Sequence, residues 1–133
     1  MSDLDHAKEL LEMARGDLNA MKGMQRPDVE VGKAFFSDEV FGFHAQQTAE
    51  KCFKAWIASL GEEYSKRHDL MALLTTLKAN GQNVAEFYGV VDLNPYAVQY
   101  RYESLASDDE ELDRDELLAT MEKLFDHVEE LLG

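Results

Sequence analysis

The sequence predicts an all-α fold: a single domain over residues 1–133, built as an up-and-down bundle of four to five main helices. Three observations support this class. Apolar residues recur at three- and four-residue spacing over long stretches. Only two prolines interrupt the chain, and no segment shows the strict two-residue alternation of a half-exposed strand. Hydrophobic residues make up 45% of the chain, so a packed core is expected.

The first helix is predicted over Asp3–Met24. Its leucines and alanines lie at the spacing of one helical face, and Ser2 precedes it as a possible N-cap. Gly23 and Pro27 are typical stop signals. Residues 25–36 then form a linker.

The second helix is predicted to follow Ser37 as its N-cap and to run to about Leu60, where Gly61 ends it. This segment carries the only tryptophan, Trp56, and the widest apolar stripe in the chain. We therefore expect it to be the central helix of the bundle.

The second half of the chain predicts shorter elements. A short helix begins at His68 or Asp69 and ends at Asn80-Gly81, and one or two helical turns follow within residues 82–89. Asn94 is expected to cap another short helix over Pro95–Tyr102, because proline favours the first helical position. The last helix is predicted from about Asp109 to Leu132, with Leu112 and Leu131 on its core face.

Charge limits the function classes. The formal net charge is −14 and the sequence pI is about 4.5, so the molecule as a whole should repel phosphate polymers. Nucleic-acid binding would need a local basic patch, and residues 51–68 are the candidate because they carry Lys51, Lys54, Lys66 and Arg67. The acidic stretch over residues 103–130 is also consistent with an ordinary solvated helix.

Targeting signals are not visible. The chain has one cysteine, Cys52, so it cannot form an internal disulfide. No apolar leader follows the first methionine, and no apolar run approaches the roughly 20 residues that cross a bilayer. We expect a cytoplasmic protein that does not associate with a membrane, and a buried structural role for Cys52.

The second predicted helix carries a row of polar side chains. At 100° per residue, His44, Gln47, Lys51 and Lys54 fall within a strip about 80° wide beside the apolar stripe. An imidazole, an amide and two ammonium groups in line can hold phosphate oxygens or base edges. An ordinary solvent-facing side of a helix could carry the same four side chains without any ligand.

Two further clusters are candidates. Lys66-Arg67-His68 at a helix start could form an anion site, although Asp69 as the N-cap would occupy the same backbone donors. The segment Tyr96 to Tyr102 places tyrosines around Arg101, which could stack a base and pair with a phosphate. Alternatively, Tyr96 belongs to the core edge and Arg101 pairs with an acid of the bundle such as Glu50.

Motifs for other chemistry are lacking. The four histidines do not stand at metal-ligand spacing and the cysteine has no thiol partner. The sequence contains neither a phosphate-binding glycine loop nor a nucleophile elbow. We therefore predict no metal, no cofactor and no catalytic residue.

Three strings, in this order, resemble the HEPN family (higher eukaryotes and prokaryotes nucleotide-binding domain). They are Phe43-His44-Ala45-Gln46-Gln47-Thr48-Ala49-Glu50-Lys51-Cys52-Phe53-Lys54-Ala55, then His68-Asp69-Leu70, then Tyr100-Arg101-Tyr102. The resemblance implies a helical domain that is usually dimeric. It also implies a minimal nucleotidyltransferase as partner, in some cases as a toxin–antitoxin pair.

Some HEPN relatives are metal-independent ribonucleases that use an arginine, four to six intervening residues and a histidine. None of the five arginines here has a histidine at that distance. The leading interpretation is therefore a non-catalytic module that binds a nucleotide or RNA, with His44, Gln47, Lys51, Lys54, His68 and Arg101 as polar contacts. A ribonuclease with an atypical site and a purely structural protein-interaction module are the alternatives.

Overall fold

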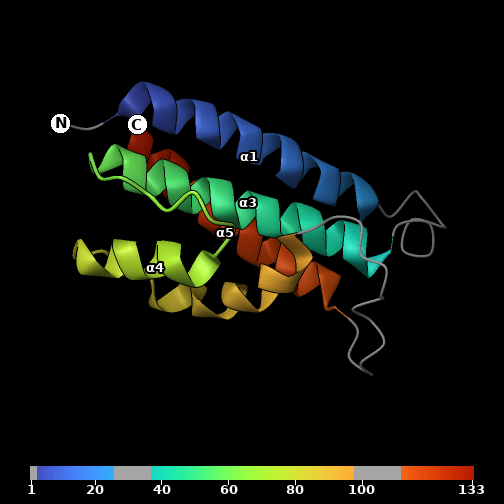
Figure 1. Ribbon diagram of the computed structural model, residues 1–133. Coiled ribbons are helices and arrows are strands. Elements are labelled where there is room, and N and C mark those ends of the chain that lie inside the picture. The colour runs from blue at the N-terminus through green and yellow to red at the C-terminus, as the bar shows by residue number, and fades with distance from the viewer. Residues whose placement is uncertain (1–2, 26–36, 98–111) are drawn as a thin grey trace.

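The computed structural model describes residues 3–25, 37–97 and 112–133 of the chain. These ranges contain four α-helices and one 3-10 segment, and they contain no strand (Figure 1). The elements are, in chain order, α1 (Leu4–Met24), α3 (Asp38–Ser59), α4 (Leu70–Ala79), η1 (Ala85–Ala97) and α5 (Arg114–Leu132). The predicted all-α bundle is confirmed.

Helix α3 is the centre of the bundle. It packs against α1, α4, η1 and α5, and Figure 1 shows α1 along one side of it and α4 with η1 along the other. Its largest apolar side chains, Phe41, Phe53 and Trp56, are at most 1% exposed. The expectation that the tryptophan-bearing helix lies in the middle is therefore confirmed.

Local signals set most helix ends as predicted. Ser37 accepts a hydrogen bond from the Val40 N–H at the start of α3, and Gly61 takes a φ of 77° just after this helix. Gly81 does the same after α4, with a φ of 78°. The cap of the first helix differs from the prediction, because Asp3 rather than Ser2 is its N-cap and the Asp3 carboxylate accepts from the His6 N–H.

The segment after α4 differs from the prediction. Instead of two short pieces, the described chain forms one 3-10 segment over Ala85–Ala97, with Pro95 inside it. Asn94 does not cap a new helix, because its side-chain oxygen accepts a hydrogen bond from the Leu70 N–H, 2.9 Å away, at the start of α4. The separate helix predicted over Pro95–Tyr102 is thus wrong as far as Ala97, and its remainder lies outside the described residues.

The last helix begins later than predicted. Asp113 is its N-cap and Leu112 is not helical. The start is fixed by a residue far away in the sequence, because Asp38 at the start of α3 accepts hydrogen bonds from the Leu112 N–H at 3.3 Å and from the Arg114 guanidinium at 2.8 Å. Leu131, predicted on the core face, is 47% exposed because it falls to one side of the buried stripe of α5.

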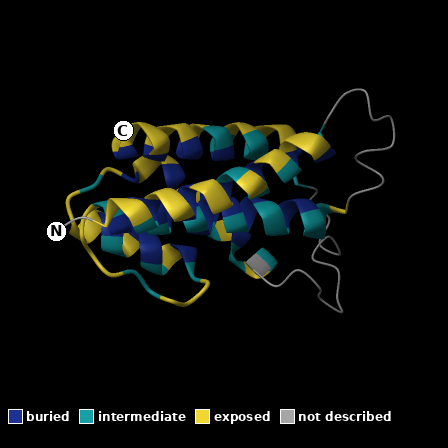
Figure 2. Ribbon diagram, turned by 90° about the horizontal axis from the view of Figure 1, so that it is seen from above, coloured by how far each residue is buried: buried dark blue, intermediate teal, exposed yellow. Residues whose placement is uncertain are grey.

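Figure 2 shows the resulting division of α5 into a buried inner side and an exposed outer side.

None of the helices within the described ranges has the length and apolar character that a membrane span requires.

Candidate ligand-binding site

The polar row predicted on α3 is organised by two carboxylates, one on α1 and the other on α3 itself. The first is Asp17 of α1. One of its oxygens lies 2.9 Å from Nδ1 of His44, and the other lies 2.6 Å from Nζ of Lys51. The three side chains are 12–23% exposed. Asp17 therefore joins two members of the row while all three remain partly in contact with water.

The charge on Asp17 is stabilised by these two partners. Burial by itself would raise the pKa of the Asp17 carboxyl, because it penalises the ionised form. Hydrogen bonds from His44 and Lys51, with the positive charge of Lys51, outweigh burial and hold that pKa below its ordinary range. Asp17 is thus a fixed negative charge at the α1–α3 contact.

The second carboxylate, Glu50, is only 4% exposed. It lies 2.8 Å from Nδ1 of His68 and 3.2 Å from Nζ of Lys54, and it accepts a 3.0 Å hydrogen bond from the Gln46 amide. Burial would raise the pKa of Glu50, but the bonds from His68 and Gln46 and the charge of Lys54 lower it overall. The contact between Glu50 and His68 therefore connects the loop before α4 to α3.

The amide of the row joins this second group indirectly. Gln47 donates a 2.7 Å hydrogen bond to the side-chain oxygen of Gln46, which in turn donates to Glu50. The structure thus brings five of the six predicted contact residues into two charged networks: His44 and Lys51 around Asp17, and Lys54, His68 and, through Gln46, Gln47 around Glu50. The sixth, Arg101, lies outside the described residues, as do Tyr100 and Tyr102.

Sequence reasoning did not identify these two carboxylates as the partners of the row, although Glu50 was considered as a partner of Arg101. For Glu50 a signal existed, since Gln46 and Lys54 stand four residues before and after it, where helix side chains meet. Asp17 gave no such signal, because it contacts His44 and Lys51 only across the α1–α3 interface.

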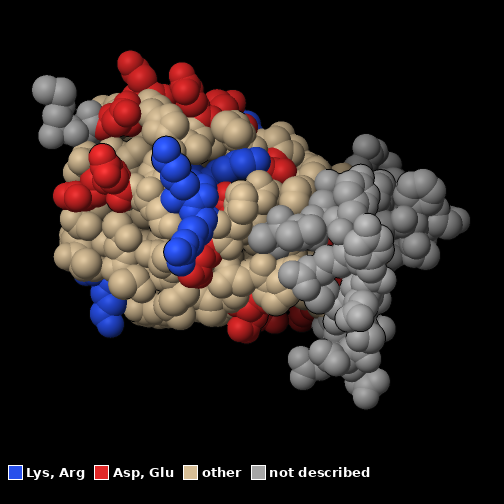
Figure 3. All heavy atoms as spheres, in the orientation of Figure 1, with Lys and Arg blue, Asp and Glu red and all other residues tan. Residues whose placement is uncertain are grey.

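A band of Lys and Arg side chains crosses the face of the molecule that Figure 3 shows, where α3 and the loop after it lie. The basic residues of these two elements are Lys51, Lys54, Lys66 and Arg67. The lysines of α3 are 18% and 11% exposed, whereas Lys66 and Arg67 are exposed. Positive charge is therefore gathered locally on a strongly acidic chain.

The start of α4 is not a separate anion site. The Asp69 carboxylate accepts from the N–H groups of Met71 and Ala72, and Asn94 accepts from that of Leu70. The backbone donors are thus occupied by the protein itself, which is the alternative that the sequence had left open.

Tyr96 also has a structural role. Its ring lies so close to α3 that a Cβ added to Gly42 would come within 2.4 Å of it. Burial and the nearby charges of Asp38 and Glu39 raise the pKa of the Tyr96 phenol. The position of Tyr96 therefore does not support the hypothesis that it stacks on a base.

Two other kinds of chemistry can be judged from the described residues. Among them, no three His, Cys, Asp or Glu side chains are grouped so as to hold a metal ion. Cys52 is fully buried, and burial raises the pKa of its thiol far above the ordinary value. A thiol held in this state is a core side chain rather than a nucleophile.

The fold and the two charged networks together define an all-helical bundle with polar groups along its central helix. The family model of the HEPN domain matches residues 7–131. The chain therefore belongs to the HEPN domain family, whose members are nucleotide- and RNA-binding modules. Searches of curated proteins and of solved structures each gave no match.

Proposed function

We propose that this protein is an accessory module that binds a nucleotide or RNA through the band formed by Lys51, Lys54, Lys66, Arg67 and His68. The observation that carries the proposal is the band of Lys and Arg side chains on one face of a chain whose net charge is −14 (Figure 3). His68 adjoins this band, because it shares the Glu50 carboxylate with Lys54. Phosphate binding draws on such local positive charge, and a global negative charge makes a diffuse interaction unfavourable.

The exposed members of the band make the first contact. Lys66 and Arg67 project from the loop, and the ring of His68 is 62% exposed although its Nδ1 bonds Glu50. Arg67 can pair with a phosphate through two parallel hydrogen bonds, which lysine cannot do. His68 then presents an open ring face to a base.

The two lysines of α3 are already paired with carboxylates, which reduces what they can contribute to phosphate binding. Lys51 and Lys54 already neutralise Asp17 and Glu50 at 2.6 and 3.2 Å, so a phosphate must share them with these carboxylates. We therefore expect modest affinity that falls steeply with salt. Removing Lys51 would leave Asp17 with one partner fewer and a stronger repulsion of phosphate.

The test is a fluorescence polarisation titration with a short single-stranded RNA and, in competition, with nucleotides, at low salt. We expect the double variant Lys66→Ala/Arg67→Ala to bind about tenfold more weakly, because two phosphate contacts are lost. Lys51→Ala should also weaken binding.

A matched control removes the same charge elsewhere. Lys8 and Lys78 are exposed, and Lys8 stands nine residues before Asp17, on the opposite side of α1. Lys8→Ala/Lys78→Ala should change the affinity by less than about twofold. Equal losses in the two double variants, or absence of RNA and nucleotide binding in the parent protein, would contradict the proposal.

The partner is proposed to be a minimal nucleotidyltransferase, and the protein itself to be a homodimer. Co-purification with the product of an adjacent nucleotidyltransferase gene tests the first statement, and light scattering after size-exclusion chromatography tests the second. Partner binding without any RNA or nucleotide binding would instead identify a structural interaction module.

A further inference from the structure

The two histidines of the charged networks use the same ring nitrogen to contact a carboxylate. Nδ1 of His68 lies 2.8 Å from Glu50, and Nδ1 of His44 lies 2.9 Å from Asp17. Although burial opposes it, hydrogen bonds from their partners lower the pKa of both carboxyls, so these groups are ionised at neutral pH and can only accept. The hydrogen of each neutral imidazole must therefore be on Nδ1, which leaves Nε2 as an acceptor.

Of these two rings, that of His68 is the more open to a ligand. Its side chain is 62% exposed, whereas that of His44 is 23% exposed. Within the part of the chain that the structure describes, Glu50 is the only hydrogen-bond partner of the His68 ring. The buried carboxylate of Glu50 thus fixes both the orientation and the tautomer of an exposed acceptor.

An acceptor differs in kind from the rest of the band. Its ammonium and guanidinium groups can only donate hydrogen bonds, which suits phosphate oxygens. A phosphodiester has no hydrogen to give to Nε2 of His68, but a ribose 2′-hydroxyl does, and this hydroxyl is the group that distinguishes RNA from DNA. Arg67 directly precedes His68, so a phosphate held by Arg67 would bring its sugar to the neighbouring ring.

We propose that Nε2 of His68 accepts a hydrogen bond from a ribose 2′-hydroxyl, so that the band selects RNA over DNA. Glu50 is a positioning residue in this arrangement, because it keeps the imidazole hydrogen on Nδ1. The inference rests on the proposed function, since the cationic groups of the band must first hold the phosphates.

The experiment is a fluorescence polarisation titration at pH 8 and low salt with three oligonucleotides of one sequence: RNA, 2′-O-methyl RNA and DNA. RNA should bind about fivefold more tightly than the other two, because it alone has the 2′-hydroxyl donor. Equal affinity for all three would overturn the inference. If Lys66→Ala/Arg67→Ala still weakened binding in that case, the proposed function would stand, whereas absence of any binding would refute both.

His68→Asn isolates the acceptor. The asparagine amide nitrogen takes the place of Nδ1 and can still donate to Glu50, whereas no atom replaces Nε2. The ratio of RNA to DNA affinity should therefore fall to about one. Lys66→Ala/Arg67→Ala should instead weaken RNA and DNA binding alike, because phosphate contacts do not distinguish the two sugars. An unchanged ratio in His68→Asn would refute the role of Nε2.

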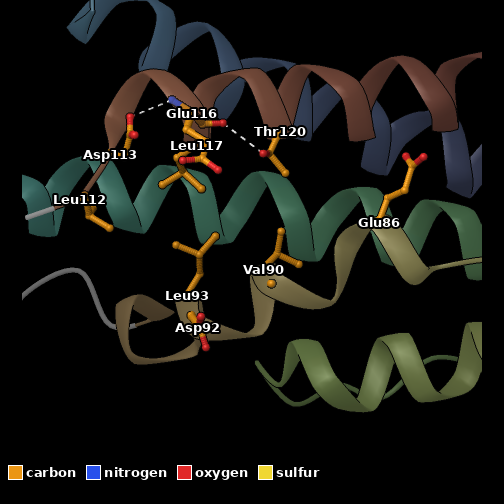
Figure 4. A pocket seen from close by; sticks show the side chains of 10 residues that line it. Glu86, Val90, Asp92, Leu93, Leu112, Asp113, Glu116, Leu117 and Thr120 are labelled. Atoms are coloured by element: carbon orange, nitrogen blue, oxygen red, sulfur yellow. Dashed lines mark hydrogen bonds between the residues drawn. The ribbon is translucent and has the colours of Figure 1, made fainter. Parts of the chain in front are cut away.

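The acidic side of the molecule supplies a matched control. The groove between η1 and α5 in Figure 4 is lined by carboxylates such as Glu86 and Glu116, with no Lys, Arg or His among the described residues that line it. His127, exposed on the same helix α5, shares a surface hollow with three carboxylates and one lysine. Because such surroundings repel phosphate, His127→Asn should leave the ratio of RNA to DNA affinity unchanged. A loss as large as that in His68→Asn would count against the site.

The tautomer can be observed without any ligand. Nitrogen-15 NMR of histidine-labelled protein at pH 8 should show the hydrogen of His68 on Nδ1, with His68→Asn identifying its signals. In Glu50→Gln the new amide can itself donate to Nδ1, so part of the hydrogen should move to Nε2 and the preference for RNA should shrink. A hydrogen on Nε2 of the parent protein would overturn the inference.

Discussion

Glu50→Gln should destabilise the protein by removing the charge at the centre of the second network. Glu50 is 4% exposed and has Lys54 at 3.2 Å and His68 at 2.8 Å. Breaking a buried pair by deleting one partner costs about 3–5 kcal/mol. Because His68 is 62% exposed and glutamine keeps one acceptor oxygen, we expect about 2–3 kcal/mol instead.

Urea denaturation followed by circular dichroism measures this loss. With a slope of about 1–3 kcal/mol/M, the midpoint should fall by roughly 0.7–3 M without a change in the slope. The control is Glu63→Gln, an identical substitution at an exposed position. It should change the free energy of unfolding by less than about 0.5 kcal/mol.

The pH dependence follows from the lowered pKa of Glu50 in the folded state. A glutamate has a pKa of about 4.3 in the unfolded chain. The stability that its charge provides is therefore fully present above about pH 4.3, and it is lost as the pH falls through the lower folded-state value. The gap between parent and Glu50→Gln should narrow from pH 5 to pH 3. A gap below about 0.5 kcal/mol at neutral pH, or one that widens on acidification, would refute this account of Glu50.

Three further outcomes are expected. Gly42→Ala should lower the free energy of unfolding by about 1–3 kcal/mol, since the new Cβ would lie 2.4 Å from the Tyr96 ring, and a Tyr96→Ala background should remove this penalty in urea melts. Cys52 should react with Ellman's reagent only at the rate of unfolding, because burial raises the pKa of its thiol and keeps the reagent away from the sulfur. Rapid labelling of the native protein would contradict this expectation. Asp17→Asn should tighten RNA binding by a few-fold, because it frees Lys51 from its 2.6 Å ion pair. Weaker binding in the polarisation assay would show instead that Asp17 positions Lys51 for the ligand rather than competing with the ligand for it.

The sequence alone determined the class of fold and most helix ends, because these depend on neighbouring residues. Ser37 and Asp69 cap the helices that follow them, and Gly61 and Gly81 end the preceding ones with positive φ. Such signals act within one helical turn, so they can be read without knowledge of the packing.

The elements that sequence reasoning misplaced are fixed by distant contacts. Asn94 is 24 residues from the Leu70 N–H that it accepts from, and Asp38 is 76 residues from the Arg114 guanidinium that it binds at the start of α5. Spacing along the chain cannot reveal which helix such a side chain will cap.

The same distinction holds for the candidate site. The alignment of His44, Lys51 and Lys54 follows from the 100° rotation per residue of a single helix, so the sequence by itself determined which side chains share that border. Only tertiary structure decided what faces them. Asp17 is one of 27 acidic residues in the chain, and the packing of α1 on α3 places its carboxylate within 2.9 Å of both His44 and Lys51. Electrostatic pairing depends on distance in space, and that distance exists only once the helices have packed.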